Sequence, residues 1–200
     1  MKLIIPTELS EITLGQLQSL TRLEAIELSE LERQKQTIEL LTNVDRQTID
    51  QIKLNDLNEV YGKLLHLTKS SDKLHKFVTI DDVKYGFHPN LSEISTGEFA
   101  DLDTLCKDLN DNLHLIMAIL YRPVQDEAHG KYNIEPYDSE LEARGRIFKK
   151  RMKADVVNSA LVFFWTIGSD YLTDSLTYLQ DQEVTRSSKT SVISGVGTVS

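Results

Sequence analysis

Helix-capping signatures recur along the chain and constrain its fold more than any other feature of the sequence. In a capping box, a Ser or Thr before the helix binds a backbone amide of the first turn, and a Glu or Gln three residues later binds back. Four segments have this spacing, beginning at Thr13, Ser29, Ser95 and Ser139. Apolar residues follow the first three at helical intervals. The sequence therefore predicts helices joined by short loops, which pack as near neighbours.

The expected helices cover about 14–28 and 30–41, a short stretch after Asp45, 55–65, 96–109, 111–120, a short stretch after Ser139, and 154–182. Lys76–Ile80 and Val83–Phe87 alternate as strands around Asp81-Asp82, which predicts a β-hairpin near 76–87. Residues 125–137 indicate a polar connector, with an edge strand at 131–134. The predicted fold class is mainly α: a helical bundle of about seven helices with one small β-hairpin and an extended C-terminal arm. We expect the helical domain to cover 1–183 and the arm to cover 184–200.

Composition places the chain among soluble, acidic proteins. Its 200 residues suit one domain with an appendage. Asp and Glu number 31 against 22 Lys and Arg, and the net charge of −9 argues against a general nucleic-acid binder. The single cysteine, Cys106, excludes an internal disulfide and fits a reducing compartment. The most apolar run, Ala160–Ile167, is too short for a bilayer span, and the first residues lack a signal-peptide core, so we expect no membrane crossing.

Motifs that carry enzymatic chemistry are missing from the sequence. No segment matches the phosphate-binding or dinucleotide-binding glycine patterns, the nucleophile elbow or a His-Glu-x-x-His pair. Cys106 and His114 would lie about 12 Å apart along one continuous helix, too far for a nucleophile and its base. The five histidines show no metal-ligand spacing, and His129 beside Asp126 and Glu127 is typical of a solvated loop. We therefore expect no catalytic residue, no cofactor and no metal, and a protein that is not an enzyme.

One segment is strongly basic. Residues 143–153 hold six cationic side chains and no acidic one, which leaves −15 on the rest of the chain. Cations at a helix C-terminus offset the helix dipole, but six exceed what that effect needs. We expect an electrostatic docking patch for an acidic protein partner, with DNA phosphates or the chain's own acidic helices as the alternatives. The patch consists of Arg144, Arg146, Lys149, Lys150, Arg151 and Lys153.

The last 17 residues, 184–200, differ from the rest in composition. Eight are Ser or Thr and two are Gly, with Arg186 and Lys189 as the only charged side chains. This composition by itself favours a disordered terminus. Val192, Ile193 and Val196 also suit a strand, so the second interpretation is an arm that orders against a partner. The two cations and these three apolar residues are the partner-binding candidates of the arm.

Three segments in the second half of the chain carry a distinctive pattern. They are Tyr85–Asp103 (YGFHPNLSEISTGEFADLD), Met117–Val124 (MAILYRPV) and Tyr132–Tyr137 (YNIEPY), followed by a helix with Phe163-Phe164. In this order they resemble a family of small structural and assembly proteins of tailed bacteriophages. The resemblance covers roughly residues 10–180 and implies no catalytic residue. By themselves the motifs indicate architecture: Gly86 and Gly97 give turn freedom, and Tyr121 with Arg122 anchors the connector through stacking or a buried ion pair.

The resemblance implies two alternative roles. The first is a virion structural protein of the head–tail (neck) region, a connector or ring subunit in a cyclic homo-oligomer that contacts the portal and adjacent ring or tail subunits. The basic patch and the arm suit such contacts, and local contact with packaged DNA stays open. This role implies a location in the virion after assembly in the host cytoplasm. The second role is a tail assembly chaperone that binds the tape-measure protein, with the apolar helix 154–182 as its client surface.

Overall fold

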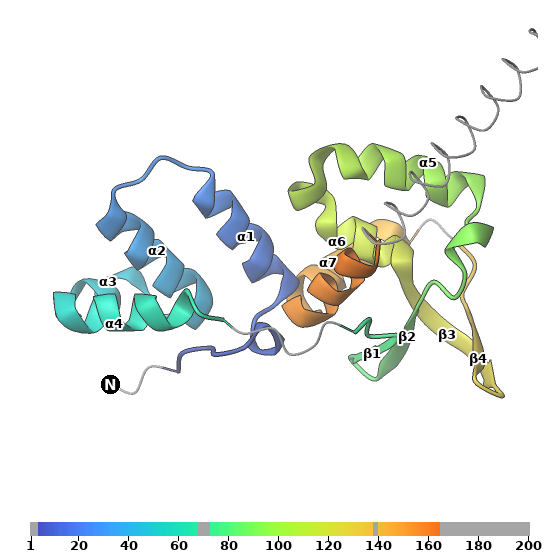
Figure 1. Cartoon of the computed structure of the whole chain (residues 1–200), viewed down its shortest axis with the longest axis horizontal. Helices are drawn as coiled ribbons and strands as arrows, with labels where there is room; N and C mark the ends of the chain where they lie inside the picture. The colour runs from blue at the N-terminus through green and yellow to red at the C-terminus, as the bar shows by residue number, and fades with distance from the viewer. Residues whose placement is uncertain (1–3, 68–72, 138–139, 165–200) are drawn as a thin grey trace, which may run out of the picture. The chain divides into compact units, whose positions relative to one another are not determined.

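The computed structural model describes residues 4–67, 73–137 and 140–164 (Figure 1). Contacts divide the chain into two units, Met1–Ala160 and Leu161–Ser200. The elements described below belong to the first unit, except that the helix beginning at residue 154 continues through residues 161–164 of the second. The expected arm and the expected continuation of this last helix to residue 182 lie outside the described residues.

Four helices follow one another in the N-terminal part of the chain. They are α1 (Leu14–Glu24), α2 (Glu30–Thr42), α3 (Arg46–Asp50) and α4 (Leu54–Leu64), preceded by a short 3-10 turn, η1 (Leu9–Glu11). The capping box at Thr13 is confirmed, because its hydroxyl accepts from the Gln16 amide and Gln16 Oε1 accepts from the Thr13 amide. Ser29 and Asp45 also cap their helices through side-chain oxygens. Local capping chemistry thus sets where three of these helices begin.

These helices bury a common apolar cluster. Its members, none more than 5% exposed, are Ile12, Ile38, Leu41, Ile49, Leu57, Leu64 and Ala154. Ala154 belongs to the helix that follows α7 and is the member most distant in sequence from the others. Its amide donates to the Ile12 carbonyl at 3.0 Å, and the Leu14 amide donates to the Met152 carbonyl at 2.8 Å. Two backbone hydrogen bonds therefore join residues 152–154 to residues 12–14 at the start of α1.

A four-stranded antiparallel sheet forms the other main element of the fold. Its strands are β1 (Phe77–Ile80), β2 (Val83–Phe87), β3 (Tyr121–Ala128) and β4 (Lys131–Ile134), paired in that order. The predicted hairpin is confirmed: Asp81 and Asp82 have φ of 47° and 64°, as a primed two-residue turn requires. The expectation of a mainly α bundle with one small hairpin is wrong, because β2 also pairs with β3 and β3 with β4. The fold is mixed α/β.

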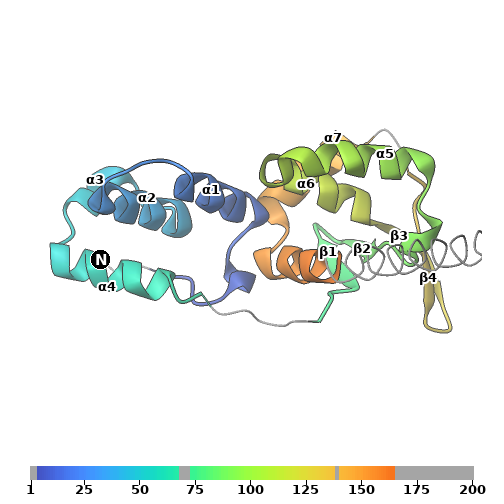
Figure 2. The same ribbon diagram turned by 45° about the horizontal axis from the view of Figure 1, so that its top comes forward.

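The sequence did not predict β3, because its residues lack the pattern that is typical of a strand. β3 begins at Tyr121, directly after α6 and without a loop. Only Tyr121 and Arg122 of β3 are buried, and its second half is exposed, so the apolar–polar alternation of a half-buried strand is absent. β3 and β4 extend beyond the helices as a two-stranded ribbon (Figures 1 and 2). The expected polar connector is therefore mostly strand, and the edge strand expected at 131–134 is confirmed as β4.

Three helices pack beside the sheet: α5 (Thr96–Leu105), α6 (Leu109–Leu120) and α7 (Leu141–Arg151). Two 3-10 turns, η2 (Leu91–Glu93) and η3 (Cys106–Asp108), precede and follow α5. The capping box at Ser95 is confirmed, with the Ser95 amide donating to Glu98 Oε2 at 2.7 Å. Ser139, where the fourth box was expected, lies outside the described residues, and Glu140 occupies the position before α7.

Two glycines let α7 approach its neighbours closely. A methyl group at Gly145 would lie 2.7 Å from Leu115 Cδ2 of α6. A methyl group at Gly15 of α1 would lie 2.7 Å from the backbone oxygen of Lys149. The contact at Gly15 is with backbone, so this approach of α7 to α1 requires glycine, whereas a methyl group at Gly145 would require the Leu115 side chain to shift.

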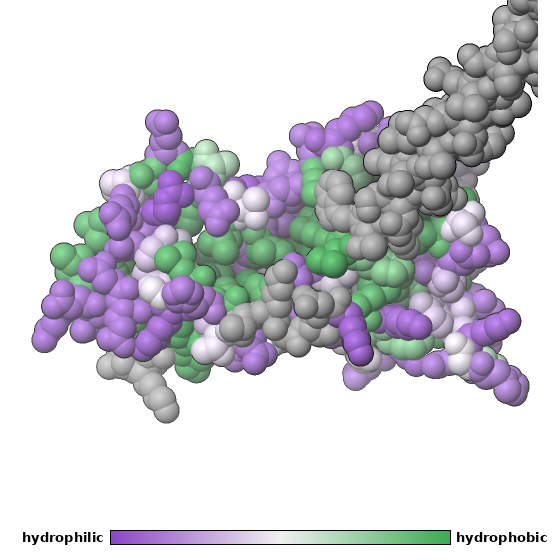
Figure 3. Space-filling model, viewed as in Figure 1, coloured by the Kyte–Doolittle hydropathy of each residue, from purple (hydrophilic) through white to green (hydrophobic). Residues whose placement is uncertain are grey.

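In the view of Figure 3 the described surface is mixed, with hydrophilic residues in most places and hydrophobic residues in several patches between them. The apolar side chains with more than half of their surface exposed are Ile4, Ile26, Leu54, Leu65 and Phe99. Among the described residues, no helix combines the length and the apolar character that a membrane crossing requires.

Candidate functional site

The predicted basic patch lies on α7 and directly after it, and one of its members is buried. Arg144 is 6% exposed, and its Nη1 donates to the Ala118 carbonyl oxygen at 3.1 Å. Ala118 is in the last turn of α6, where a cation also offsets the negative end of the helix dipole. Arg144 therefore joins α7 to α6 inside the fold and does not contribute to an exposed patch.

The other five cations form the α7 cationic face, defined as Arg146, Lys149, Lys150, Arg151 and Lys153. Lys149 is half-buried and the remaining four are exposed. Arg146 and Lys150 are four residues apart on the helix, so they lie on the same side of it. Arg151 Nε lies 3.7 Å from Asp81 Oδ1 in an exposed ion pair that water screens. The face is thus suited to bind carboxylates or phosphates.

The partner-binding candidates of the arm are outside the part of the chain that the structure describes. These are Arg186, Lys189, Val192, Ile193 and Val196. Their expected role therefore stays a prediction.

The three segments that carry the bacteriophage resemblance meet in the structure. The Tyr132 hydroxyl donates to the Phe87 carbonyl at 2.5 Å, which joins the third segment to the first. A methyl group at Gly86 would lie 2.7 Å from the Tyr132 ring, so glycine is needed for the ring to lie on β2. Gly97 faces Tyr137 at van der Waals distance. Neither glycine has a positive φ, so close packing rather than turn freedom explains Gly86.

A buried ion pair lies where these segments meet. Arg122 Nη2 is 2.5 Å from Glu98 Oε1, and each side chain is 4% exposed. His88 Nε2 is 3.6 Å from the same carboxylate oxygen. A buried ion pair was one of the two alternatives for Arg122; it is confirmed, and Glu98 is its partner. We call His88, Glu98, Arg122 and Tyr137 the Glu98–Arg122 cluster.

Burial and charge shift the pKa values in this cluster. Burial raises the pKa of Glu98, but hydrogen bonds from Ser95 and the positive charge of Arg122 outweigh it, so the pKa lies below its ordinary value. Burial lowers the pKa of His88, and the Arg122 charge adds to this effect against the opposing charge of Glu98. At neutral pH the cluster therefore holds a carboxylate, a guanidinium and a neutral imidazole.

Tyr137 covers the ion pair. The centre of its ring is 6.0 Å from Arg122 Cζ, and its hydroxyl donates to Asp101 Oδ2 of α5. Burial and the hydrogen bond to the Asp101 carboxylate raise the pKa of Tyr137 to about 12, so the hydroxyl remains a donor at neutral pH. The charged groups of the cluster bind one another and join α5 to β3, an arrangement suited to holding the fold together.

Cys106 and His114 lie in unrelated surroundings. Cys106 is exposed after α5, and desolvation of its sulfur and the charge of Asp103 raise its pKa, which makes it a poor nucleophile at neutral pH. His114 Nδ1 is 3.4 Å from Gln18 Nε2, and burial and the Lys149 charge lower the pKa of the imidazole. In the described ranges, no group of three or more His, Cys, Asp and Glu side chains could hold a metal ion.

Arg122 was predictable from the sequence, but the groups around it were not. A charged side chain inside the apolar run Met117–Val124 was the signal for a buried pair. Glu98 was explained by its capping role, whereas one carboxylate performs both tasks, Oε2 binding Ser95 and Oε1 binding Arg122. His88 becomes a neighbour only through the pairing of β2 with β3, which the sequence did not reveal.

No family model matches the chain, and comparisons with curated proteins and with solved structures also return no match. The role of the chain is therefore inferred from its own surfaces and from the resemblance of its three segments.

Proposed function

We propose that this chain is a non-enzymatic structural protein of the bacteriophage virion, a connector or ring subunit of the head–tail region. The observation that carries the proposal is the α7 cationic face. Four exposed cations, Arg146, Lys150, Arg151 and Lys153, lie within eight consecutive residues of a chain whose net charge is −9. Such a separation of charge suits a subunit that docks on the acidic surface of a neighbour.

The close packing of α7 against α6 and α1 favours a docking role for the α7 cationic face. Gly145 and Gly15 hold α7 close to α6 and α1, and the buried Arg144 binds the end of α6. Cations on a firmly packed helix lose little backbone freedom when they bind, which favours association. The face is therefore a preorganised platform rather than a loose basic segment.

An acidic protein surface is the partner that the charges favour. Removing the six cations of 143–153 leaves −15 on the rest of the chain, which would repel the continuous phosphates of DNA. A second copy or another acidic subunit, such as the portal or an adjacent ring or tail protein, offers carboxylates instead. Contact between two unlike surfaces of identical subunits closes into a ring when the rotation permits.

Mass spectrometry of purified particles of the encoding phage tests the assignment. We expect the chain in the particle in a fixed ratio to the portal protein. Abundance in infected-cell lysate with absence from washed particles would overturn the virion assignment.

Charge reversal tests the surface. The variant Arg146→Glu, Lys150→Glu, Lys153→Glu should reduce incorporation into particles about tenfold or more, because attraction becomes repulsion. The matched control, Lys53→Glu, Lys107→Glu, Lys131→Glu, changes the net charge equally at exposed positions outside α7 and should be incorporated normally. Circular dichroism checks that both variants fold. Equal incorporation of the two would show that the face is not the docking surface, and loss only from DNA-filled particles would indicate a phosphate contact.

The alternative role is a tail assembly chaperone for the tape-measure protein. Val162, on the helix that begins at residue 154, is 40% exposed and could contact an apolar client. Ala154, Val157 and Ala160 of the same helix are fully buried in the fold, so they are not available to a client. If the chain has this role, it should co-purify with the tape-measure protein from lysate and be absent from mature particles.

A further inference from the structure

A groove between α1 and α2 combines an apolar lining with charged walls. It has a volume of about 400 Å³ and is lined by Ser19, Arg22, Leu23, Ile26, Gln36, Glu39, Leu40 and Arg46. Ile26 keeps 53% of its surface exposed, so the described residues of the chain do not cover it. The Arg33 guanidinium donates to the carbonyl oxygens of Leu23 and Ile26, each at 3.1 Å. These bonds fix the loop between α1 and α2, and the groove is therefore largely preformed.

The two cations of the groove are already engaged. Arg22 Nε donates to Asp111 Oδ1 at 2.8 Å. Arg46 binds the Glu32 carboxylate and lies 3.7 Å from Glu39 Oε2. The groove therefore offers little free positive charge to a ligand.

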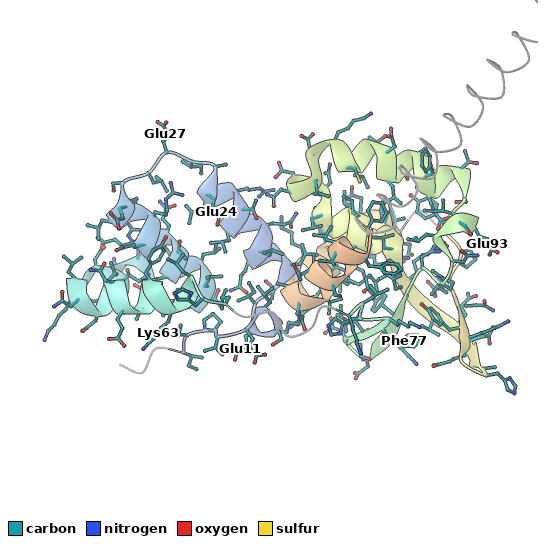
Figure 4. The ribbon with its side chains drawn as sticks, viewed as in Figure 1. Glu11, Glu24, Glu27, Lys63, Phe77 and Glu93 are labelled. Carbon is teal, nitrogen blue, oxygen red and sulfur yellow. The ribbon has the colours of Figure 1, made fainter. Side chains whose placement is uncertain are left out.

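The segment that carries Ile26 is acidic. Glu24, Glu27 and Glu30 are exposed on the end of α1, the following loop and the start of α2, on either side of Ile26. Figure 4 shows Glu27 projecting away from this loop. No ion pair joins these three carboxylates to another side chain among the residues described. A ligand with apolar side chains and a neighbouring positive charge would match the groove and the carboxylates near Ile26.

The chain itself contains a segment of this chemistry. Residues 184–200 hold Val192, Ile193 and Val196, with Arg186 and Lys189 before them and no acidic residue. If extended, 192–196 would span about 13 Å, close to the roughly 16 Å length of an 11-residue helix such as α1.

We propose that residues 184–200 of one copy bind in the α1–α2 groove of a second copy. Val192, Ile193 and Val196 fill the apolar groove, and Arg186 and Lys189 bind the carboxylates of Glu24, Glu27 and Glu30. Because the arm of one copy binds the groove of the next, the contact joins unlike surfaces of identical chains. Such contacts connect the copies in an open series or in a ring. The contact depends neither on the α7 cationic face nor on a bacteriophage origin, so it can fail while the proposed function stands.

Disulfide trapping in the full-length protein tests this contact. In a Cys106→Ser background, one copy carries Ile26→Cys in the groove and a differently tagged copy carries Ile193→Cys in the arm. We expect mild oxidation to link the two tagged copies. The control pairs Ile193→Cys with Leu54→Cys, which is 60% exposed on α4, and should give about tenfold less product.

Charge reversal supplies a second measurement in the same assay. Glu24→Lys, Glu27→Lys, Glu30→Lys should lower cross-linking about tenfold, and Arg186→Glu, Lys189→Glu on the arm should restore it. Equal products in the groove and control pairs, or no product, would overturn the proposal. A disulfide formed only within a chain that carries both Ile26→Cys and Ile193→Cys would overturn the assignment to a second copy.

Discussion

The Arg122 guanidinium of β3 and the Glu98 carboxylate of α5 form an ion pair inside the fold, with Nη2 at 2.5 Å from Oε1 and each side chain 4% exposed. The pair connects a strand to the first turn of a helix, and the other carboxylate oxygen accepts from the Ser95 amide. A buried pair offers little net stability over an apolar substitute, but the loss of one partner leaves a buried charge without compensation.

Glu98→Gln should lower the free energy of unfolding by about 3 kcal/mol, because Arg122 keeps its charge while its counter-charge disappears. Glutamine preserves the shape and can still accept from Ser95, which isolates the effect of charge. Urea unfolding followed by circular dichroism measures the change. Glu93→Gln, which neutralises an exposed carboxylate of η2, is the matched control and should stay within about 0.5 kcal/mol of the unsubstituted protein. If both substitutions cost the same, the ion pair does not stabilise the fold.

Two lowered pKa values predict that the protein loses stability in acid. The folded pKa of His88 lies below that of a free imidazole, so below about pH 6.5 the unfolded chain takes up a proton that the folded chain does not. The folded pKa of Glu98 is also lowered, so its contribution is present above about pH 4.3 and is lost as the pH falls through the folded value. The free energy of unfolding should therefore decrease from about pH 6.5 downward.

His88→Gln tests the first part of this decrease. Urea midpoints measured between about pH 7 and pH 5 should depend less on pH in the variant, because one titrating group is gone. Burial also lowers the pKa of His114, so the urea midpoint keeps some dependence on pH in both proteins. An unchanged slope would mean that His88 titrates alike in the folded and unfolded chain.

Helix starts were predictable because their determinants are local. Thr13 and Gln16, or Ser95 and Glu98, lie three residues apart, and their mutual hydrogen bonds need no other part of the chain. The hairpin was likewise predictable from its two-residue turn. Local spacing was therefore enough to find most helices and the first two strands.

The features that the sequence did not reveal depend on contacts between residues far apart in the chain. β3 is held by β2 and β4, and its own residues lack an alternating pattern. The partner of Arg122 depends on that same sheet, since Gly86 pairs with Arg122 in the β2–β3 register. The burial of Arg144 depends on the packing of α7 against α6, so it too could not be distinguished from the exposed cations around it.

Close packing at Gly15 predicts opposite effects of alanine at two helical glycines. Gly15→Ala should lower the free energy of unfolding by about 1–3 kcal/mol, because its methyl group would meet the Lys149 backbone oxygen at 2.7 Å. Gly62→Ala in α4 meets nothing within 4 Å and should raise it by about 1 kcal/mol through helix propensity alone. Urea unfolding of the pair gives both values. Stabilisation by both alanines would show that α1 and α7 are farther apart in solution.

The turn between β1 and β2 contains stored backbone strain that glycine should release. Asp82 has a φ of 64°, a left-handed conformation that costs an L-residue with a Cβ about 1–2 kcal/mol. Asp82→Gly should therefore raise the free energy of unfolding by about 0.5–1 kcal/mol, after allowance for the greater freedom of glycine in the unfolded chain. Asp103→Gly, at an exposed position inside α5, is the matched control and should lower it by about 1 kcal/mol. Equal destabilisation by the two substitutions would contradict the left-handed turn.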